Sequence, residues 1–366
     1  MSPGSWGQPA GRRLGAFGLL AGCATVALLA TAGCAAKPSK VEVGVLLPTA
    51  ATAAHWDDVD GPMLERFLRQ HGVHPDVRNV DAKQMVTNAE QLIKDGAKAL
   101  IVAAPDPATS AAVVHAASAQ GVAVVDYDPP PADNPAGSPA DYALAPDYRK
   151  IGELQGRGVI RGVRSTDDAS VIVLAQAPNE AAEAAMTAGQ LDVLQPRFDA
   201  KAYRLVARQV LDGPGAPPAD RAFDQLLAAN GGTVNAVLAA NDQIAAAVRT
   251  ELRAKNLLGK VTVTGFGASP DALKAVLRGD QFMTSYLPAE ARTESAAALA
   301  STLAGGDRAA ADRMTVAGPG HARSMLVAPA SITLDTIKSV FDSGMADSDD
   351  ICTDELAMRC NQLSIS

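Results

Sequence analysis

Polar and aromatic residues directly follow several short apolar runs in the first half of the chain. The first run is followed by His55, Trp56 and Asp57, and two later runs are followed by Asp106 and Asp128. Carboxylates in such positions can accept charge-assisted hydrogen bonds from hydroxyl or amine groups, and an indole can stack on the apolar face of a flat ring. The pattern indicates a binding site for a small ligand rich in hydrogen-bonding groups.

The second half of the chain repeats this pattern. Asn179 and Glu180 follow one apolar run, Asn241 and Asp242 follow another, and Phe266 follows a third. In an open parallel sheet, ligands bind beyond the carboxyl ends of the strands. Both sets of side chains are therefore expected at strand ends.

Some of these residues have a competing local role. Trp56 can fill the fold or cap the first helix instead of meeting a ligand. Asp106 precedes Pro107, an order typical of a helix N-terminus, so the capping role is favoured for it. Asn241 and Asp242 also open a helix, and capping and ligand binding can be shared there.

No metal, cofactor or catalytic constellation is expected. Asp57, Asp58 and Asp60 lie close to His55, but their spacing matches no metal-binding loop, and acidic residues at a helix start also suit its dipole. The five histidines are scattered, and phosphate-loop, nucleophile-elbow, HExxH and CxxC motifs are missing. We therefore do not predict an enzyme.

The elements that position these residues follow a β–α rhythm. Strands are expected at Val41–Leu47, Ala99–Ala103, Val122–Asp126, Val171–Leu174, Leu205–Val210, Val234–Ala239, Val261–Thr264, Phe282–Tyr286 and Ser324–Val327. Helices are expected at Met63–Gln70, Met85–Asp95, Ala108–Gln120, Ala181–Leu194, Phe223–Asn230, Gln243–Lys255, Ala289–Leu303 and Leu334–Phe341. Apolar strands alternating with amphipathic helices predict an α/β fold with parallel sheets covered on both faces.

A proline-rich break over 128–135 divides this rhythm into two series, because proline lacks a backbone donor and restricts the residue before it. Two series of similar size within 366 residues predict two doubly wound lobes, each with its own core. Segments that follow both series imply that the chain crosses between the lobes more than once. The strand ends of both lobes are then expected to face one cleft.

The N-terminal segment is typical of an export signal. Arg12 and Arg13 precede an apolar run over 14–32, and small residues lead to Cys34. This ending is similar to a bacterial lipobox, in which the cysteine is lipidated. Cys23, which follows Leu-Ala-Gly, is a second candidate, and an uncleaved transmembrane anchor is the remaining alternative.

Lipidation at Cys34 is preferred, because cleavage at Cys23 would leave an apolar stretch on the mature protein. Residues 34–40 then tether an exported domain to the outer face of the cytoplasmic membrane. This cleavage removes Cys23 and leaves Cys352 and Cys360 as the cysteines other than the lipidated Cys34. In an oxidising compartment they are expected to form a local disulfide, and a free pair is the alternative.

The overall charge argues against one class of partner. The formal net charge is −8, and Lys and Arg do not cluster along the chain. Binding to nucleic acid needs clustered cations against the phosphates. Nucleic acid is therefore not an expected partner.

Several segments carry a resemblance to a known family. They are Val43–Leu47, Gln84–Gly96, Ala99–Val102, Gly121–Asp128, Lys150–Gln155, Val237–Asp242, Gly259–Gly265 and Ile332–Gly344 with Cys352. In this order they resemble the periplasmic sugar-binding proteins of the ribose type, and among these the D-xylose-binding proteins of ABC transporters. The resemblance, from Val41 to about Cys352, implies a type I periplasmic-binding-protein fold whose two lobes are joined by a three-segment hinge and close on a ligand.

Position by position, the resemblance assigns ligand contacts to Trp56, Asp128, Asp147, Asn241 and Asp242. Other family contacts are replaced, by Pro129, Tyr148, the stretch 179–182, Pro214, Phe266 and Leu287. A pocket with fewer polar groups favours a less polyhydroxylated ligand, because polar groups left unpaired by a ligand are costly. The resemblance therefore predicts a ligand other than xylose itself.

The domain prediction divides the chain into five parts. They are a signal peptide over 1–33, a tether over 34–40, a first lobe over 41–144 and about 268–320, a second lobe over 145–267 and about 321–346, and a tail over 347–366. The expected function is that of a monomeric solute-binding component of an ABC importer, which captures a sugar or polyol for a membrane permease. The alternative is a ligand sensor of the same fold that signals to a membrane receptor or kinase.

Overall fold

The computed structural model describes residues 40–49, 55–128, 138–164, 168–176, 180–211, 217–318 and 322–365. The predicted export signal and both lipidation candidates, Cys23 and Cys34, lie outside these residues. Within the described part, no helix combines the length and the apolar character needed to cross a membrane.

The first lobe is built on a seven-stranded sheet. Its strands are β1 (Val43–Leu47), β2 (Pro75–Asn79), β3 (Ala99–Val102), β4 (Ala123–Asp126), β5 (Tyr142–Pro146), β11 (Val316–Ala317) and β12 (Arg323–Val327). Its helices are η1 (Trp56–Asp60), α1 (Gly61–Gln70), α2 (Ala82–Asp95), α3 (Pro107–Ser118), α9 (Ala289–Ala304) and α10 (Arg308–Met314). The strand order is β11-β12-β5-β4-β3-β1-β2, and all neighbours are parallel except β11 and β12.

The second lobe is built on a six-stranded sheet. Its strands are β6 (Ala169–Ala175), β7 (Tyr203–Val210), β8 (Ala236–Ala239), β9 (Thr262–Thr264), β10 (Met283–Tyr286) and β13 (Ala330–Thr333). Its helices are α4 (Tyr148–Gly162), α5 (Glu180–Asp199), α6 (Pro217–Ala229), α7 (Asp242–Ala254), α8 (Pro270–Arg278) and α11 (Lys338–Asp342), and the tail adds α12 (Ser348–Ile351), η2 (Asp354–Leu356) and α13 (Ala357–Gln362). The order is β13-β10-β9-β8-β6-β7, with only β10 and β13 antiparallel.

Helices cover both faces of each sheet. Every residue of β1, β3, β4, β6 and β8 is buried. Successive residues of β1 point to opposite faces, so Val45 and Leu46 belong to two different apolar clusters. Strands buried on both sides need nearly continuous apolar sequences. The prediction of two α/β lobes with doubly wound sheets is therefore confirmed.

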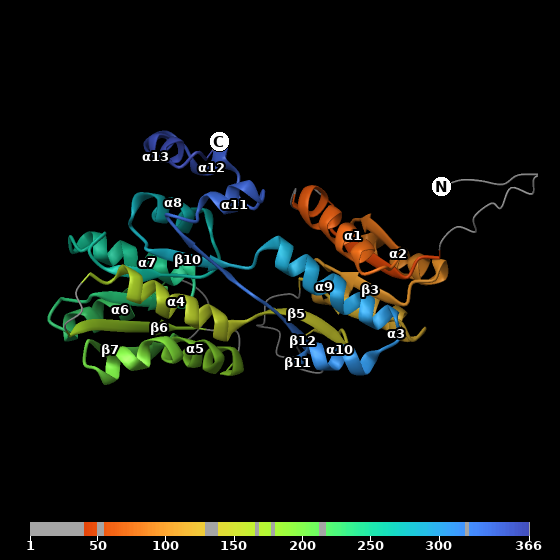
Figure 1. Cartoon of the computed structure of the whole chain (residues 1–366), viewed down its shortest axis with the longest axis horizontal. Coiled ribbons are helices and arrows are strands. Elements are labelled where there is room, and N and C mark those ends of the chain that lie inside the picture. Colours follow the sequence, from red (N-terminus) through yellow and green to blue (C-terminus); the bar gives the residue numbers. More distant parts are fainter. Residues whose placement is uncertain are drawn as a thin grey trace, which may run out of the picture. The chain divides into compact units, whose positions relative to one another are not determined.

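Within the described residues the chain passes three times between the sheets, from β5 to α4, from β10 to α9 and from β12 to β13 (Figure 1). The parallel neighbours β5 and β12 leave the first sheet at the same edge, and the backbone N–H of Asp147 donates to the carbonyl of Val327 at 3.1 Å. Since β1, β3 and β4 run in the same direction, their carboxyl ends lie on the edge from which the chain crosses. The same holds in the second sheet, where β10 is parallel to β9.

The structure moves two predicted lobe boundaries. Residues 268–320 were assigned to the first lobe, but β10 is hydrogen-bonded between β9 and β13 in the second sheet. Residues 321–346 were assigned to the second lobe, but β12 pairs with β5 in the first sheet. The sequence of a short strand does not indicate which strand it pairs with. The lobe to which β10 and β12 belong is therefore set by pairing with strands far away in the chain.

Two further elements, β5 and α4, lie in a stretch for which the sequence pattern predicted none. Helix α4 contains Gly152, Gly156, Gly158 and Gly162, and glycine has a low helix propensity. These glycines allow close packing instead: a Cβ at Gly152 would lie 2.1 Å from the carbonyl oxygen of Met186 in α5. The packing partner therefore explains a helix that local propensity disfavours.

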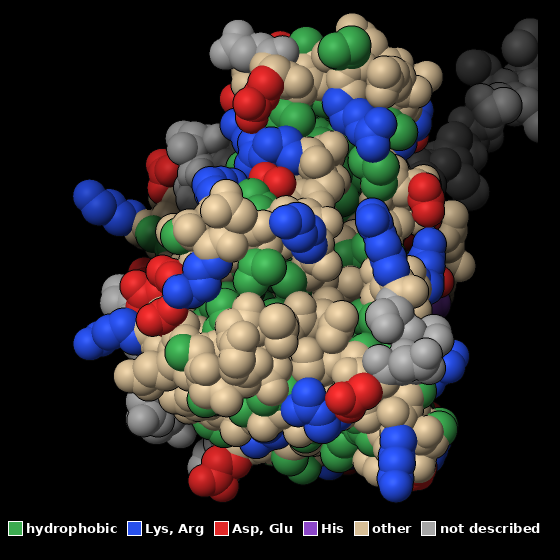
Figure 2. All heavy atoms as spheres, turned by 90° about the vertical axis from the view of Figure 1, so that its left-hand side faces the viewer, with side chains coloured by type: hydrophobic (Ala, Val, Ile, Leu, Met, Phe, Trp, Pro, Cys, Tyr) green, Lys and Arg blue, Asp and Glu red, His purple; other side chains and the backbone are tan. Residues whose placement is uncertain are grey.

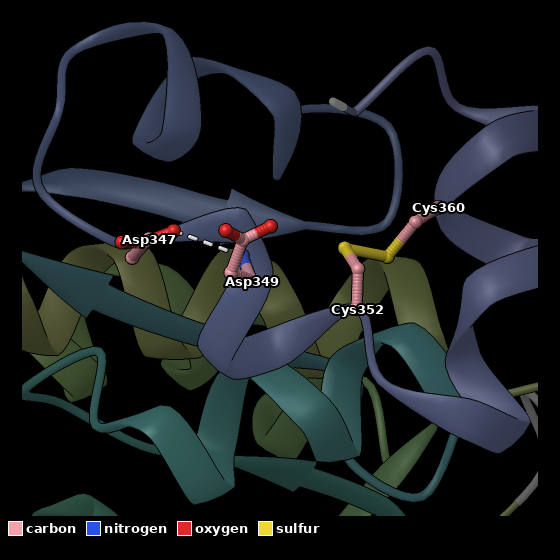
Figure 3. The surroundings of a disulfide bond; sticks show 4 residues. All are labelled: Asp347, Asp349, Cys352 and Cys360. Carbon is pink, nitrogen blue, oxygen red and sulfur yellow. Dashed lines mark hydrogen bonds between the residues drawn. A yellow bond between two sulfur atoms is a disulfide. The ribbon is translucent and has the colours of Figure 1, made fainter.

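The tail packs on the second lobe as a separate apolar cluster that includes Leu273 and Leu277 of α8, Ile351 and Cys360. Cys352 and Cys360 are joined by a disulfide with their Cα atoms 5.9 Å apart (Figure 3). Asp347 caps α12 by accepting a hydrogen bond from the N–H of Asp349 at 2.9 Å (Figure 3). The pairing that the sequence predicted is geometrically available in the fold.

We expect the double substitution Cys352→Ser and Cys360→Ser to loosen the tail by about 2 kcal/mol, because the crosslink restricts the unfolded ensemble of a short loop. Hydrogen exchange of the amides in α13 should accelerate, while exchange in β8 should stay as in the wild type. Unchanged protection in α13 would show that apolar packing alone holds the tail.

Candidate ligand-binding site

A buried carboxylate organises the carboxyl edge of the first sheet. Asp60, at the end of η1, is 0% exposed. Its Oδ1 accepts hydrogen bonds from the hydroxyl of Tyr127 and from Nη2 of Arg292, the latter at 2.8 Å, and its Oδ2 lies 2.6 Å from Nδ1 of His55. A buried charge needs such partners, because desolvation disfavours it. We call Asp60, His55, Tyr127 and Arg292 the Asp60 cluster.

The Asp60 cluster joins three parts of the first lobe. His55 and Asp60 flank η1, Tyr127 follows β4, and Arg292 stands in the first turn of α9. Burial raises the pKa of Tyr127 well above its usual value, so its hydroxyl stays protonated and donates to Asp60. The guanidinium of Arg292 lies over the Tyr127 ring, 5.3 Å from its centroid.

Trp56 packs inside the lobe. Its indole is 6% exposed and meets the Tyr127 ring edge-on, with centroids 6.3 Å apart. The His55 ring lies 4.3 Å from it, centroid to centroid. Little of the indole is open to a ligand, which favours the packing role that the sequence left as an alternative.

Two carboxylates stand at the end of β4. Asp128 is exposed, although the protein atoms around it desolvate its carboxylate and raise its pKa, while the charges of Arg292 and His55 act in the opposite direction. Asp126 is buried and accepts a hydrogen bond from the Ser138 hydroxyl at 2.6 Å. Burial raises the pKa of Asp126 to about 6. Asp128 is therefore the carboxylate of β4 that a ligand can reach.

Asp57 and Asp106 have partners within the protein. Asp57 accepts a hydrogen bond from the side chain of Asn79 in β2. Asp106 caps α3 by accepting from the N–H of Thr109 at 2.8 Å and from its hydroxyl at 2.7 Å, and these bonds lower its pKa. The capping role favoured for Asp106 is the one the structure shows.

On the second lobe, Asn241 combines capping with a side-chain pair. Its Oδ1 accepts from the N–H of Ile244 at 2.9 Å, and its Nδ2 donates to Oε1 of Gln176 at 2.9 Å. Gln176 follows β6 directly, so the pair joins the carboxyl ends of β6 and β8. Gln176 was not among the predicted site residues.

Asp242 is turned into the fold. It is 5% exposed, and its carboxylate accepts hydrogen bonds from the hydroxyl of Thr284 at 2.8 Å, the N–H of Ser269 at 2.9 Å and the amide of Gln281 at 3.3 Å. Burial raises its pKa, and these bonds partly offset the rise. Its visible role is to hold the β9–α8 loop against β10.

An aromatic pair and a helix cap stand near the first crossing. The rings of Tyr148 and Phe266 meet edge-on, with centroids 6.4 Å apart, and burial raises the pKa of Tyr148 to about 12. Asp147 caps α4 by accepting from the N–H of Lys150 at 3.0 Å. Glu180 is exposed at the start of α5, and Asn179 lies outside the described residues.

Sequence reasoning missed the partners that organise the site. Asp60 was considered only with its acidic neighbours, and neither Tyr127 nor Arg292 was singled out. Arg292 is 232 positions from Asp60, and no local pattern links them. The available signal was a cation in the first turn of a helix, where the helix dipole disfavours it.

The described residues include no group of three or more His, Cys, Asp or Glu side chains arranged to hold a metal ion.

A depression of about 330 Å³ at the amino ends of β3 and β4, lined by Lys98 and Gln120 among others, lies at the edge opposite to the Asp60 cluster. On the face shown in Figure 2, Lys and Arg side chains are interspersed with Asp and Glu. The side chains at the strand ends present hydrogen-bond donors and acceptors.

Comparison with known proteins matches residues 43–308 to the model of a periplasmic binding protein domain. The D-xylose-binding periplasmic protein of Escherichia coli is 27% identical over 260 residues, which are 71% of this chain and 77% of that protein. The multiple sugar-binding periplasmic protein SbpA of Azospirillum brasilense is 25% identical over 327 residues, 83% of this chain and 89% of that protein. A periplasmic ribose ABC transporter structure from Conexibacter woesei aligns with a TM-score of 0.57 at 17% identity, covering 86% of this chain and 98% of that one.

Proposed function

Because the chain belongs to the periplasmic binding protein family, we propose that it is the solute-binding component of an ABC importer. Its ligand is a small carbohydrate-like molecule, a sugar or a polyol, held between the carboxyl edges of the two sheets. The D-xylose-binding and multiple sugar-binding relatives support a ligand of this class. The chain acts by binding, and a membrane permease receives the ligand.

The observation that carries the proposal is the arrangement of hydrogen-bonding groups beside the three crossings. The first lobe offers an exposed carboxylate, Asp128, on which the charge of Arg292 acts. The second lobe offers the amides of Asn241 and Gln176. A ligand bearing several hydroxyl groups can pair with donors and acceptors on both sides, and charge-assisted bonds to hydroxyls are strong.

Two aromatic side chains can pack against the ring of the same ligand. Tyr148 and Phe266 are partly buried and present apolar surface near the first crossing. Aromatic rings pack on the C–H face of a sugar ring. The replaced family contacts, Tyr148 and Phe266 among them, favour a ligand other than xylose.

We place the protein outside the cytoplasmic membrane, anchored by lipid on Cys34. The apolar run over 14–32 and the small residues before Cys34 support this location, and so does its family. The mass of the processed protein identifies the cleavage site, and a mature chain that begins at Cys23 would show that Cys23 is the lipidated residue instead of Cys34.

A thermal-shift panel tests the ligand class. The panel contains D-ribose, D-xylose, D-glucose, myo-inositol, glycerol and several amino acids. We expect one of the sugars or polyols other than xylose to raise the melting temperature most, because a ligand at 100 times its Kd stabilises the folded state by about 2.7 kcal/mol. Stabilisation by amino acids alone, or by no compound while the protein is folded, would contradict the proposal.

A further inference from the structure

Arg292 is held in one orientation at the carboxyl edge of the first sheet. It stands in the first turn of α9, the helix that follows the crossing from β10 into the first lobe. Its Nη2 donates to Oδ1 of Asp60 at 2.8 Å, and the Tyr127 ring lies below it. The guanidinium is planar and its donors point in fixed directions, so these two contacts determine where the remaining N–H groups point.

The fixed guanidinium has donors to spare. Among the described residues, the buried Nε of Arg292 has no hydrogen-bond partner, although the Arg292 side chain is still 22% exposed. A buried donor without a partner costs free energy, and it normally pairs with protein, water or ligand. Asp60, in contrast, already has three partners.

Anchoring α9 to the η1–α1 segment does not by itself explain this arrangement. A buried ion pair adds little to stability, because the desolvation of both charges offsets their attraction. A second ion pair, Arg66 with Glu290 at 3.7 Å, already joins α1 to α9 on the exposed surface. An arginine with a donor that has no protein partner, whose charge acts on the exposed carboxylate of Asp128, is suited to ligand recognition.

We propose that Arg292 is a ligand-binding residue of the first lobe. It donates to one ligand oxygen, and Asp128 on the same sheet edge accepts a hydrogen bond from a hydroxyl of the same ligand. A donor and an acceptor on the same sheet edge fit two hydroxyl groups of one ligand, so the ligand class is a diol or higher polyol, as found in sugars and cyclic polyols. Asp60 is the positioning residue that orients the guanidinium. This inference rests on the proposed function and makes its ligand class more specific.

The test compares Arg292→Lys and Arg292→Met with the control Arg66→Met. Arg66 is a matched control, because it also forms an ion pair between the η1–α1 segment and the first turn of α9, and its guanidinium lies over an aromatic ring, 4.6 Å from the centroid of Phe67. The probes are D-glucose, D-ribose and myo-inositol, together with 2-deoxy-D-glucose and 2-deoxy-D-ribose, and the dissociation constants are measured by calorimetry on the processed full chain.

For the best probe, Arg292→Lys should weaken binding at least tenfold, because lysine keeps the charge and loses the planar fork. In Arg292→Met the preference for the parent sugar over its deoxy analogue should shrink at least fivefold, whereas Arg66→Met should leave affinity and preference unchanged. If Arg292→Met does not fold, the double variant Arg292→Met with Asp60→Asn removes the orphaned charge and gives the same readout.

The outcomes separate this inference from the proposed function. If the wild type binds none of the probes, the proposed function fails. If the wild type binds a probe and the Arg292 variants keep both affinity and deoxy discrimination, the ligand-binding role of Arg292 is wrong and the proposed function stands. An equal loss of affinity for parent and deoxy sugars would reduce Arg292 to a structural residue.

Discussion

Replacing Gly189 by alanine should lower the free energy of unfolding of the second lobe by about 3 kcal/mol or more. A Cβ at this position in α5 would lie 1.9 Å from the carbonyl oxygen of Arg149 in α4 and 2.9 Å from the backbone nitrogen of Glu153. Both neighbours are backbone atoms, so no side-chain rotation relieves the clash. Overpacking of this kind typically costs about 1–3 kcal/mol, and more where the surroundings cannot move.

Urea unfolding followed by far-UV circular dichroism measures this effect. Gly305→Ala is the matched control, since Gly305 has helical backbone angles (φ −69°) and the nearest atom to its Cβ would be 3.4 Å away. We expect the control to stay close to the wild type. A Gly189 variant as stable as the control would mean that the backbones of α4 and α5 lie farther apart than the distances around Gly189 indicate.

Asp126→Asn should change stability in a strongly pH-dependent way. Burial raises the pKa of Asp126 from 3.8 to about 6, so the folded state binds a proton more tightly than the unfolded chain. The stabilising contribution of this proton is complete below the unfolded pKa and is lost as the pH rises through about 6. Asparagine carries no such proton. The stability of the variant relative to wild type should therefore rise by roughly 2.5 kcal/mol between pH 4 and pH 7.5.

Urea denaturation at both pH values tests this prediction. Asp106→Asn is a control of opposite sign, because the Thr109 hydrogen bonds lower the pKa of Asp106, and its stabilising contribution is lost as the pH falls. Parallel pH profiles for wild type and Asp126→Asn would show that Asp126 ionises normally in the folded protein.

The sequence alone was enough for the features that depend on near neighbours. Apolar runs alternating with helical segments predicted two doubly wound lobes, since a strand covered on both faces must be apolar at every position. The Asp-Pro order at Asp106 predicted its cap, because the capping bond reaches only to the third residue of the helix. The apolar run before Asn241 placed this residue at a strand end, because a buried strand and the helix cap after it are both local patterns.

The tertiary structure decided everything that depends on distant partners. It placed β10 in the second sheet and β12 in the first, against the predicted boundaries. It buried Trp56 and Asp242 among neighbours from other elements, and it joined Asp60 to Arg292 across 232 positions. The physical reason is that local propensity and periodicity report on a residue's own helix or strand, whereas sheet pairing and charge pairing are set by packing between segments far apart in the chain.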